Sequence, residues 1–200
     1  MKPVCLVLGA GAGIGGTVAA KFASEGYHSY LCRRSDQEGL DKLIKGIEDS
    51  GGSASGSLMN AIEEDALEEV ITKVESDVGP IEVLVYNLGA QTGMKLLSET
   101  THKEFEWGWR MASFGLFRAA KVLCPLMVER GKGNILVTSA TAAMRGNKNQ
   151  HSHAAAMGAR RMLCQSLNAE FGRQGIHVAH TVIDGAIDHP WIKENFPDIY

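Results

Sequence analysis

The sequence predicts a single α/β domain built on a doubly wound parallel sheet, and three observations support that prediction. Short apolar runs alternate with longer segments of helical spacing along the chain. Glycines follow the first apolar run directly, beginning at Gly9. The 200 residues contain no linker, repeat or low-complexity segment and suit one domain with a sizeable core. We therefore expect residues 1–200 to form one domain, whose parallel strands are joined by right-handed crossovers.

Six strands are expected from short apolar or β-prone runs. The run Ile81–Tyr86 is apolar enough for a strand that is covered on both faces. Ser53–Met59 is rich in small residues and is the weakest of the six. The expected strands are Val4–Leu8, His28–Cys32, Ser53–Met59, Ile81–Tyr86, Asn134–Ser139 and His177–Ile183.

Helices are expected between these strands, where apolar residues recur every three or four positions. One such set is Leu40, Leu43, Ile44 and Ile47, and a second is Leu67, Val70, Ile71 and Val74. The pair Gly79-Pro80 ends the helix that carries the second set. The expected helices cover residues 17–23, 36–50, 63–78, 98–130 in two pieces, and 151–173.

The tail from Asp188 to Tyr200 contains no clear strand. A seventh strand would be expected to cover the edge beside the sixth. We therefore expect the sheet to be short of its last strand, with an open edge unless a partner or further chain covers it.

Composition excludes several classes of function. The net charge of −3 gives no reason to expect nucleic acid or an anionic membrane as a partner, and no apolar run approaches a membrane span. The N-terminus does not resemble a secretory signal. The four cysteines are scattered without paired spacing, which is typical of reduced thiols. We expect a soluble, cytoplasmic protein.

The glycine-rich stretch Gly9–Gly16 lies between a strand and a helix, the context in which such a motif indicates phosphate binding. Gly11, Gly13 and Gly16 fit the spacing G-x-G-x-x-G. Gly9, Gly13 and Gly15 fit G-x-x-x-G-x-G and place the first glycine at the strand end, where a tight turn needs it. We favour the second spacing. The alternative is a glycine-rich turn that binds no ligand.

Three stretches together resemble the short-chain dehydrogenase/reductase family. They are Gly9-Ala10-Gly11-Ala12-Gly13-Ile14-Gly15, Asn87-Leu88-Gly89-Ala90, and the passage from Ser166-Leu167-Asn168-Ala169-Glu170 through Gly175-Ile176-His177-Val178 to Asp184-Gly185. The resemblance covers essentially the whole chain and implies a Rossmann-type fold that binds a dinucleotide. It implies contacts to the cofactor from Gly9, Gly13, Ile14, Gly15, Asn60, Asn87, Gly89 and Gly185.

The end of the second strand indicates which dinucleotide is preferred. NAD-preferring folds place an acid there to accept from the ribose 2′-hydroxyl, whereas here Cys32 is followed by Arg33 and Arg34. Two guanidinium groups suit a 2′-phosphate and therefore favour NADP(H). The alternative is a pair of solvated arginines at a helix start.

The resemblance also implies a catalytic asparagine, serine, tyrosine and lysine, and this sequence has none of them at the matching positions. Spacing within the family pattern places Ala112, Ala140, His153 and Met157 there. A family tyrosine exchanges the proton and needs a nearby cation to do so at neutral pH. The chemistry that the family performs is therefore in doubt for this chain.

Substitutes for the missing groups can be named. His153 can exchange a proton near neutral pH without a neighbouring cation, although it can also be a helix-start histidine with no chemical role. Ser139 and Thr141 flank Ala140 and offer hydroxyls, whereas Met157 favours packing. Two hypotheses follow. The chain is an NADP(H)-dependent oxidoreductase acting on a carbonyl or alcohol with non-standard acid–base residues, or it is a catalytically inactive NADP(H)-binding sensor or scaffold.

Self-association and a substrate pocket are the remaining expectations. The helices at 108–130 and 151–173 correspond to those through which family members dimerise, which implies a homo-oligomer. The pocket for a small-molecule substrate would be lined by residues after the fourth, fifth and sixth strands. These include Gln91, Thr92, Met94, Met144 and Trp191, and they do not define the ligand.

Overall fold

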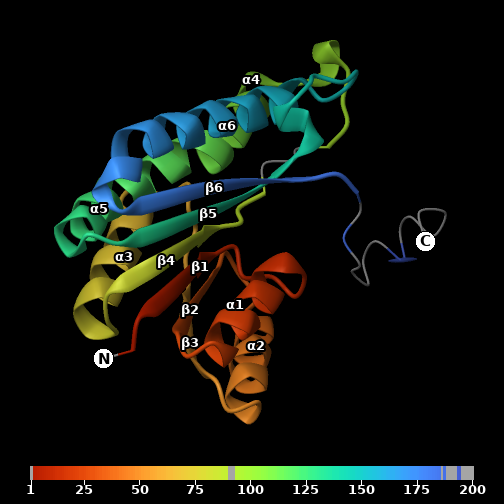
Figure 1. Ribbon diagram of the computed structural model, residues 1–200. Coiled ribbons are helices and arrows are strands. Elements are labelled where there is room, and N and C mark those ends of the chain that lie inside the picture. Colours follow the sequence, from red (N-terminus) through yellow and green to blue (C-terminus); the bar gives the residue numbers. More distant parts are fainter. Residues whose placement is uncertain (1, 90–92, 186, 188–192, 195–200) are drawn as a thin grey trace.

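A computed structural model describes residues 2–89, 93–185, 187 and 193–194. Its centre is a six-stranded parallel sheet in the order β3-β2-β1-β4-β5-β6 (Figure 1). The strands are β1 (Val4–Leu8), β2 (His28–Arg33), β3 (Ser53–Leu58), β4 (Ile81–Tyr86), β5 (Gly133–Ala140) and β6 (Ile176–Ile183). The predicted doubly wound parallel sheet is confirmed, and every predicted strand is present close to its expected ends.

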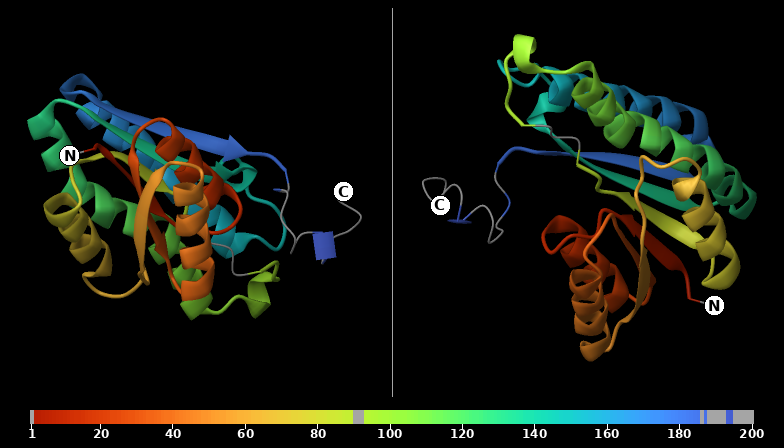
Figure 2. Two further views of the ribbon diagram at one scale, coloured as in Figure 1. Left: turned by 90° about the horizontal axis from the view of Figure 1, so that it is seen from below. Right: turned by 180° about the vertical axis from the view of Figure 1, so that it is seen from behind.

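Helices cover both faces of the sheet (Figures 1 and 2). One face carries α1 and α2, whereas the other carries α3, α5 and α6. The helices are α1 (Ile14–Ser24), α2 (Gln37–Asp49), α3 (Ala66–Asp77), α4 (His102–Trp109), α5 (Gly115–Arg130) and α6 (His151–Phe171). Short 3₁₀ turns are η1 (Leu97–Glu99), η3 (Thr141–Ala143) and η4 (Gly172–Gln174).

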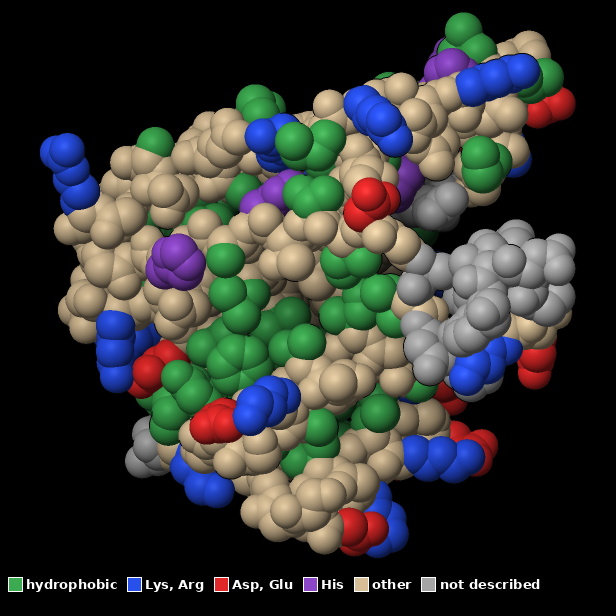
Figure 3. Space-filling model, turned by 45° about the vertical axis from the view of Figure 1, so that its right-hand side comes forward, with side chains coloured by type: hydrophobic (Ala, Val, Ile, Leu, Met, Phe, Trp, Pro, Cys, Tyr) green, Lys and Arg blue, Asp and Glu red, His purple; other side chains and the backbone are tan. Residues whose placement is uncertain are grey.

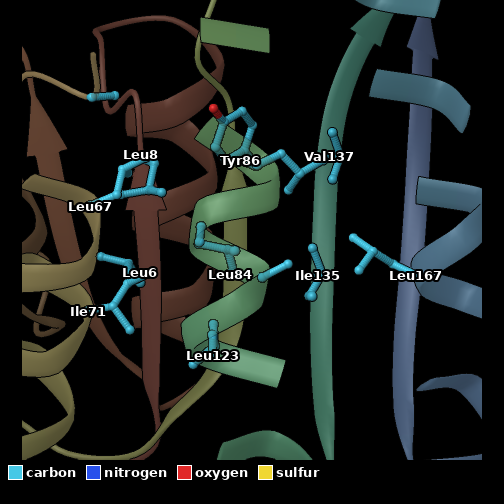
Figure 4. Packing of buried hydrophobic residues seen from close by; sticks show 14 of the residues in the cluster. Leu6, Leu8, Leu67, Ile71, Leu84, Tyr86, Leu123, Ile135, Val137 and Leu167 are labelled. Atoms are coloured by element: carbon cyan, nitrogen blue, oxygen red, sulfur yellow. The ribbon is translucent and has the colours of Figure 1, made fainter. Parts of the chain in front are cut away.

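Apolar side chains on the two faces form separate cores. The larger core lies between the sheet and the helices α3, α5 and α6, where Leu84 of β4 lies near Leu123 of α5 and Tyr86 lies beside Val137 of β5 (Figure 4). The smaller core lies beneath α1 and α2 and includes Val7 and Leu31. Because β1 and β4 contribute to both cores, they are buried on both sides, as their apolar sequences predict.

The helical segment predicted at 98–130 contains a π-helical turn, η2 (Arg110–Phe114), between α4 and α5. This turn redirects backbone carbonyls toward neighbouring side chains. The carbonyl of Met111 accepts a hydrogen bond of 2.5 Å from the Tyr86 hydroxyl, and the carbonyl of Ala112 accepts one of 2.8 Å from Arg160. Turns of this kind recur at functional sites. Helical periodicity alone does not distinguish this turn from a regular α-helix.

The expectation that no apolar run approaches a membrane span was wrong by length and composition, because the helical stretch His102–Arg130 is apolar enough to cross a bilayer. More than half of its most apolar window, 56%, is buried inside the protein. Its apolar character is therefore accounted for by packing against the sheet.

Among the described residues β6 has one strand neighbour, β5, and its other side is an edge of the sheet.

Candidate dinucleotide site

Close contacts require glycine at three positions between the end of β1 and the first turn of α1: Gly9, Gly15 and Gly16. Gly9 has a φ of +93°, and a Cβ there would lie 2.7 Å from the backbone oxygen of Asn87. A Cβ on Gly15 would lie 2.3 Å from the backbone oxygen of Gly9. Gly11 has open space around it. A Cβ on Gly16 would lie 2.7 Å from the backbone oxygen of Gly11 and 2.9 Å from the Leu43 side chain. The contacts at Gly9 and Gly15 fit the favoured spacing, whereas Gly16 belongs to the other spacing, G-x-G-x-x-G.

The first turn of α1 is left open to a ligand. Its N-cap residue, Gly13, has no side chain to cap the helix, and the first turn carries no acidic residue. The N–H of Gly16 already donates to the backbone oxygen of Gly11 at 2.7 Å. The N–H groups of Ile14 and Gly15, together with the positive end of the helix dipole, attract an anion. The beginning of α1 can therefore bind a phosphate.

Asn87, at the end of β4, joins the glycine turn to β5. Its Nδ2 atom donates to the backbone oxygen of Gly9 at 2.9 Å, and its Oδ1 atom accepts from the Thr138 hydroxyl at 2.7 Å. The side chain of Asn87 thus holds three strand ends in register. It supports the site from within the fold, in addition to lining it.

A cavity of about 220 Å³ lies at the carboxyl ends of β4, β5 and β6, beside the glycine turn. It brings together five predicted site residues, which are Ile14, Asn87, Gly89, Ser139 and Gly185. Its other lining residues are Leu88, Thr138, Ala140, Met157, Arg160, Ile183 and Ile187. A crevice at this end of a doubly wound sheet is where such folds bind ligands.

Two of the three candidate catalytic residues lie outside this lining. His153 is on the first turn of α6 and is 8% exposed, and Thr141 begins η3. Ser139 does line the cavity, and its hydroxyl lies 3.7 Å from the sulfur of Met157. Their proposed catalytic roles stay predictions.

The positions implied by the family pattern are apolar in three of four cases. Ala112 is fully buried in the π-helical turn, and Ala140 and Met157 line the cavity. None of these three side chains can exchange a proton. The nearby phenol of Tyr86 is buried, which raises its pKa, and it donates to a backbone carbonyl. Ser139 and Thr138 are the hydroxyl groups among the described lining residues.

Arg160, which sequence reasoning did not single out, is the charged residue of the described cavity lining. It is 1% exposed and lies about one turn after Met157 on α6. A signal was present in the sequence, because an arginine in an apolar helical stripe is rarely buried without a specific role.

The two arginines at the end of β2 have different surroundings. Arg33 forms an ion pair of 2.7 Å with Asp36, the residue that precedes α2. Asp36 also caps α2 by accepting from the backbone N–H of Gly39 at 2.9 Å. A 2′-phosphate near Arg33 would therefore share that guanidinium with a carboxylate, which the sequence analysis did not anticipate.

Arg34 lies with Asn60 in the lining of a second cavity, of about 430 Å³, between the end of β3 and α3. The Nδ2 atom of Asn60 donates to Glu63 at 2.9 Å, whereas its buried Oδ1 atom has no hydrogen-bond partner among the described residues. A buried amide oxygen in this state is costly. A donor such as the amino group of an adenine ring would satisfy it, so the residue fits the predicted dinucleotide.

The residues named for a substrate pocket are only partly described. Met94 and Met144 are 64% and 55% exposed. Gln91, Thr92 and Trp191 lie outside the described residues. The identity of a substrate is not defined by this set.

Comparison with known proteins identifies the class. Residues 3–198 match the family model of the short chain dehydrogenases, and the chain belongs to this family. It is 29% identical over 195 residues to the 3-oxoacyl-[acyl-carrier-protein] reductase FabG of Thermotoga maritima, covering 98% of this chain and 78% of that protein.

Solved structures of short-chain dehydrogenases and related reductases share the fold of this chain. A short-chain dehydrogenase from Rhodopseudomonas palustris has a TM-score of 0.86 and 33% identity over 94% of this chain and 85% of its own. A single-substitution variant of actinorhodin polyketide ketoreductase, solved with NADPH, has a TM-score of 0.88 and 27% identity over 100% of this chain and 77% of its own.

Proposed function

We propose that this chain binds NADP(H) at the carboxyl ends of its strands and acts as an oxidoreductase on a carbonyl or alcohol. The observation that carries the proposal is the uncapped start of α1 behind the glycine turn, directly beside a cavity. The arginines at the end of β2 support a site for the 2′-phosphate of the cofactor, and the unsatisfied amide oxygen of Asn60 supports a site for its adenine ring. The NADPH-bound ketoreductase relative supports the same cofactor.

Each residue of the site would have a separate role. Bound NADPH supplies a hydride. The first turn of α1 holds a phosphate, and Ile14 and Gly185 lie on the wall of the cavity. Ser139 offers a hydroxyl that can donate to a carbonyl oxygen. His153 is the candidate proton donor; it is 8% exposed and lies on α6 one turn before Met157 of the cavity lining.

A second candidate function is a catalytically inactive NADP(H)-binding sensor or scaffold. The alanines at 112 and 140 and the methionine at 157 favour it, because none of these residues can exchange a proton. Single-turnover oxidation of NADPH across aldehydes, ketones and quinones separates the two candidates. Turnover that falls sharply in His153→Ala, with NADPH affinity kept, supports the enzyme. Binding without turnover supports the sensor.

Selectivity for the 2′-phosphate can be tested at Arg33. We expect Arg33→Asp to lower the preference for NADPH over NADH by about tenfold or more, because a charge-assisted contact is replaced by repulsion. The measurement is isothermal titration of both cofactors. Arg173→Asp makes the same charge change at an exposed position in η4 and should leave the ratio as it was. An unchanged ratio in Arg33→Asp would refute the assignment of the 2′-phosphate.

We also propose that the chain forms a homo-oligomer through the outer faces of α5 and α6. Phe117 is 46% exposed on α5, and its ring stacks on that of Phe114. Phe117 also lines an apolar groove of about 250 Å³ between α5 and α6, together with Phe171. A separate group of hydrophobic side chains, with charged side chains around it, lies in the middle of the face shown in Figure 3. Exposed apolar surface of this kind favours association.

The oligomer can be tested by light scattering after size exclusion. We expect the wild-type chain to have a multiple of the monomer mass and Phe117→Glu to shift toward monomer. Leu58→Glu is the control, because Leu58 is 42% exposed at the opposite edge of the sheet. A wild-type monomer would refute this proposal without affecting the cofactor site.

A reducing, cytoplasmic location is part of the proposal. The four cysteines, Cys5, Cys32, Cys124 and Cys164, are all buried free thiols. Burial raises the pKa of Cys5 and of Cys32 to about 12, so these thiols are protonated at neutral pH and unreactive.

A further inference from the structure

Arg160 carries a positive charge into the interior beside the candidate nicotinamide cavity. The residue is 1% exposed, and its side chain lies among the lining of the 220 Å³ cavity. Among the described residues no carboxylate lies within ion-pair distance of it, although ten other ion pairs are present. A buried arginine without a carboxylate is uncommon, because burial of an unpaired charge is costly.

Backbone carbonyls hold the guanidinium in one position. Its Nε atom donates to Ala112 at 2.8 Å, its Nη1 atom to Thr138 at 2.8 Å, and its Nη2 atom to Leu88 at 2.7 Å. These oxygens come from the π-helical turn, from β5 and from the loop after β4. The guanidinium also lies 5.2 Å from the centre of the Tyr86 ring. Carbonyl dipoles and a ring face stabilise the cation without neutralising it.

The titratable groups nearest to Arg160 are uncharged at neutral pH. Burial raises the pKa of the Cys164 thiol to about 11, and it raises the pKa of the Tyr86 phenol as well. Burial lowers the pKa of His180, and the charge of Arg160 lowers it further. Burial also lowers the pKa of Arg160 itself, but an arginine stays protonated because its ordinary pKa exceeds about 12. A full positive charge therefore acts on the cavity.

We infer that Arg160 makes the site selective for the reduced dinucleotide, so that NADPH binds more tightly than NADP⁺. The inference rests on the proposed cofactor. The two forms differ at the nicotinamide ring, which is neutral when reduced and cationic when oxidised. An uncompensated guanidinium beside the ring repels only the oxidised form, and because Arg160 is itself 1% exposed, that repulsion is less screened than one between two surface charges. Such selectivity suits a reductase that must bind NADPH, and equally a sensor of the NADPH to NADP⁺ ratio.

Isothermal titration of NADPH and NADP⁺ tests the inference without any need for turnover. We expect the wild-type protein to bind NADPH about tenfold or more tightly than NADP⁺. Arg160→Met and Arg160→Gln remove the charge and should bring the ratio close to one, whereas Arg160→Lys should keep much of it. Arg161→Met is the matched control, because the adjacent arginine does not line the cavity and should leave the ratio unchanged.

A ligand-side comparison in the wild-type protein covers the case in which the neutral variants fail to fold. The fragment 2′-phospho-ADP-ribose lacks the nicotinamide ring. We expect NADP⁺ to bind no more tightly than this fragment and NADPH to bind more tightly than both. Equal affinities for NADPH and NADP⁺ would overturn the inference and leave the cofactor proposal intact. Failure of both nucleotides to bind would overturn both.

Discussion

Replacing Gly15 with alanine is expected to destabilise the protein by about 1–3 kcal/mol and to weaken NADPH binding strongly. Helix propensity alone predicts the opposite, because alanine stabilises a helix interior by up to about 1 kcal/mol over glycine. A Cβ on Gly15 would lie 2.3 Å from the oxygen of Gly9 and 2.8 Å from the Cα of Ala10. Both are backbone atoms, so α1 would have to move away from the glycine turn.

Gly46→Ala is the matched control for this prediction. Gly46 is also helical, in α2, but a Cβ there meets nothing within 4 Å. We expect this variant to gain about 0.5–1 kcal/mol and to keep its NADPH affinity. Denaturant unfolding and titration of NADPH measure both effects. Equal stabilisation of the two variants would show that the close contact between α1 and the glycine turn is not required.

Asn87→Asp is expected to have the second large effect, a loss of roughly 2–4 kcal/mol of stability at neutral pH. The oxygen that accepts from Thr138 is kept in this change. The group that donates to the Gly9 carbonyl at 2.9 Å becomes an oxygen, and a carboxylate then faces a carbonyl across a partly buried contact. The charge also lies beside the phosphate site, so NADPH affinity should fall as well.

The pH dependence of this variant gives a sharper test. Burial against a carbonyl raises the pKa of the introduced carboxyl above its ordinary value of about 3.9, because only the protonated form can donate to Gly9. The folded state then binds the proton more tightly than the unfolded state. Stability relative to wild type should therefore recover as the pH falls toward the ordinary carboxyl range. Asn168→Asp, at an exposed site on α6, should show no such recovery.

The fold could be predicted because each element has a local signal. Ile81–Tyr86 forms a strand as its apolar run predicts, and Leu67, Val70, Ile71 and Val74 form one buried face of α3. The π-helical turn Arg110–Phe114 could not be predicted, because it depends on partners far away in the sequence. Its carbonyls meet Tyr86 from β4 and Arg160 from α6.

The candidate site was predictable in part for the same reason. The glycine spacing identified Gly9 and Gly15, whose neighbours in sequence form the turn. The ion pair of Arg33 with Asp36 depends on a left-handed backbone at Asp36, with a φ of +73°, which no pattern indicates. Arg160 was missed because its role comes from three carbonyls on three separate elements. Spacing along the sequence places residues on helices but does not say what their side chains meet.

The most direct test of the account is isothermal titration of NADPH and NADH into the wild-type protein. The central claim is that the glycine turn, the uncapped start of α1 and the arginines at the end of β2 form an NADP(H) site. The account predicts saturable binding of NADPH at one site per chain, with NADH bound about tenfold or more weakly. The account would be contradicted if neither NADPH nor NADH binds, or if the protein binds both with equal affinity.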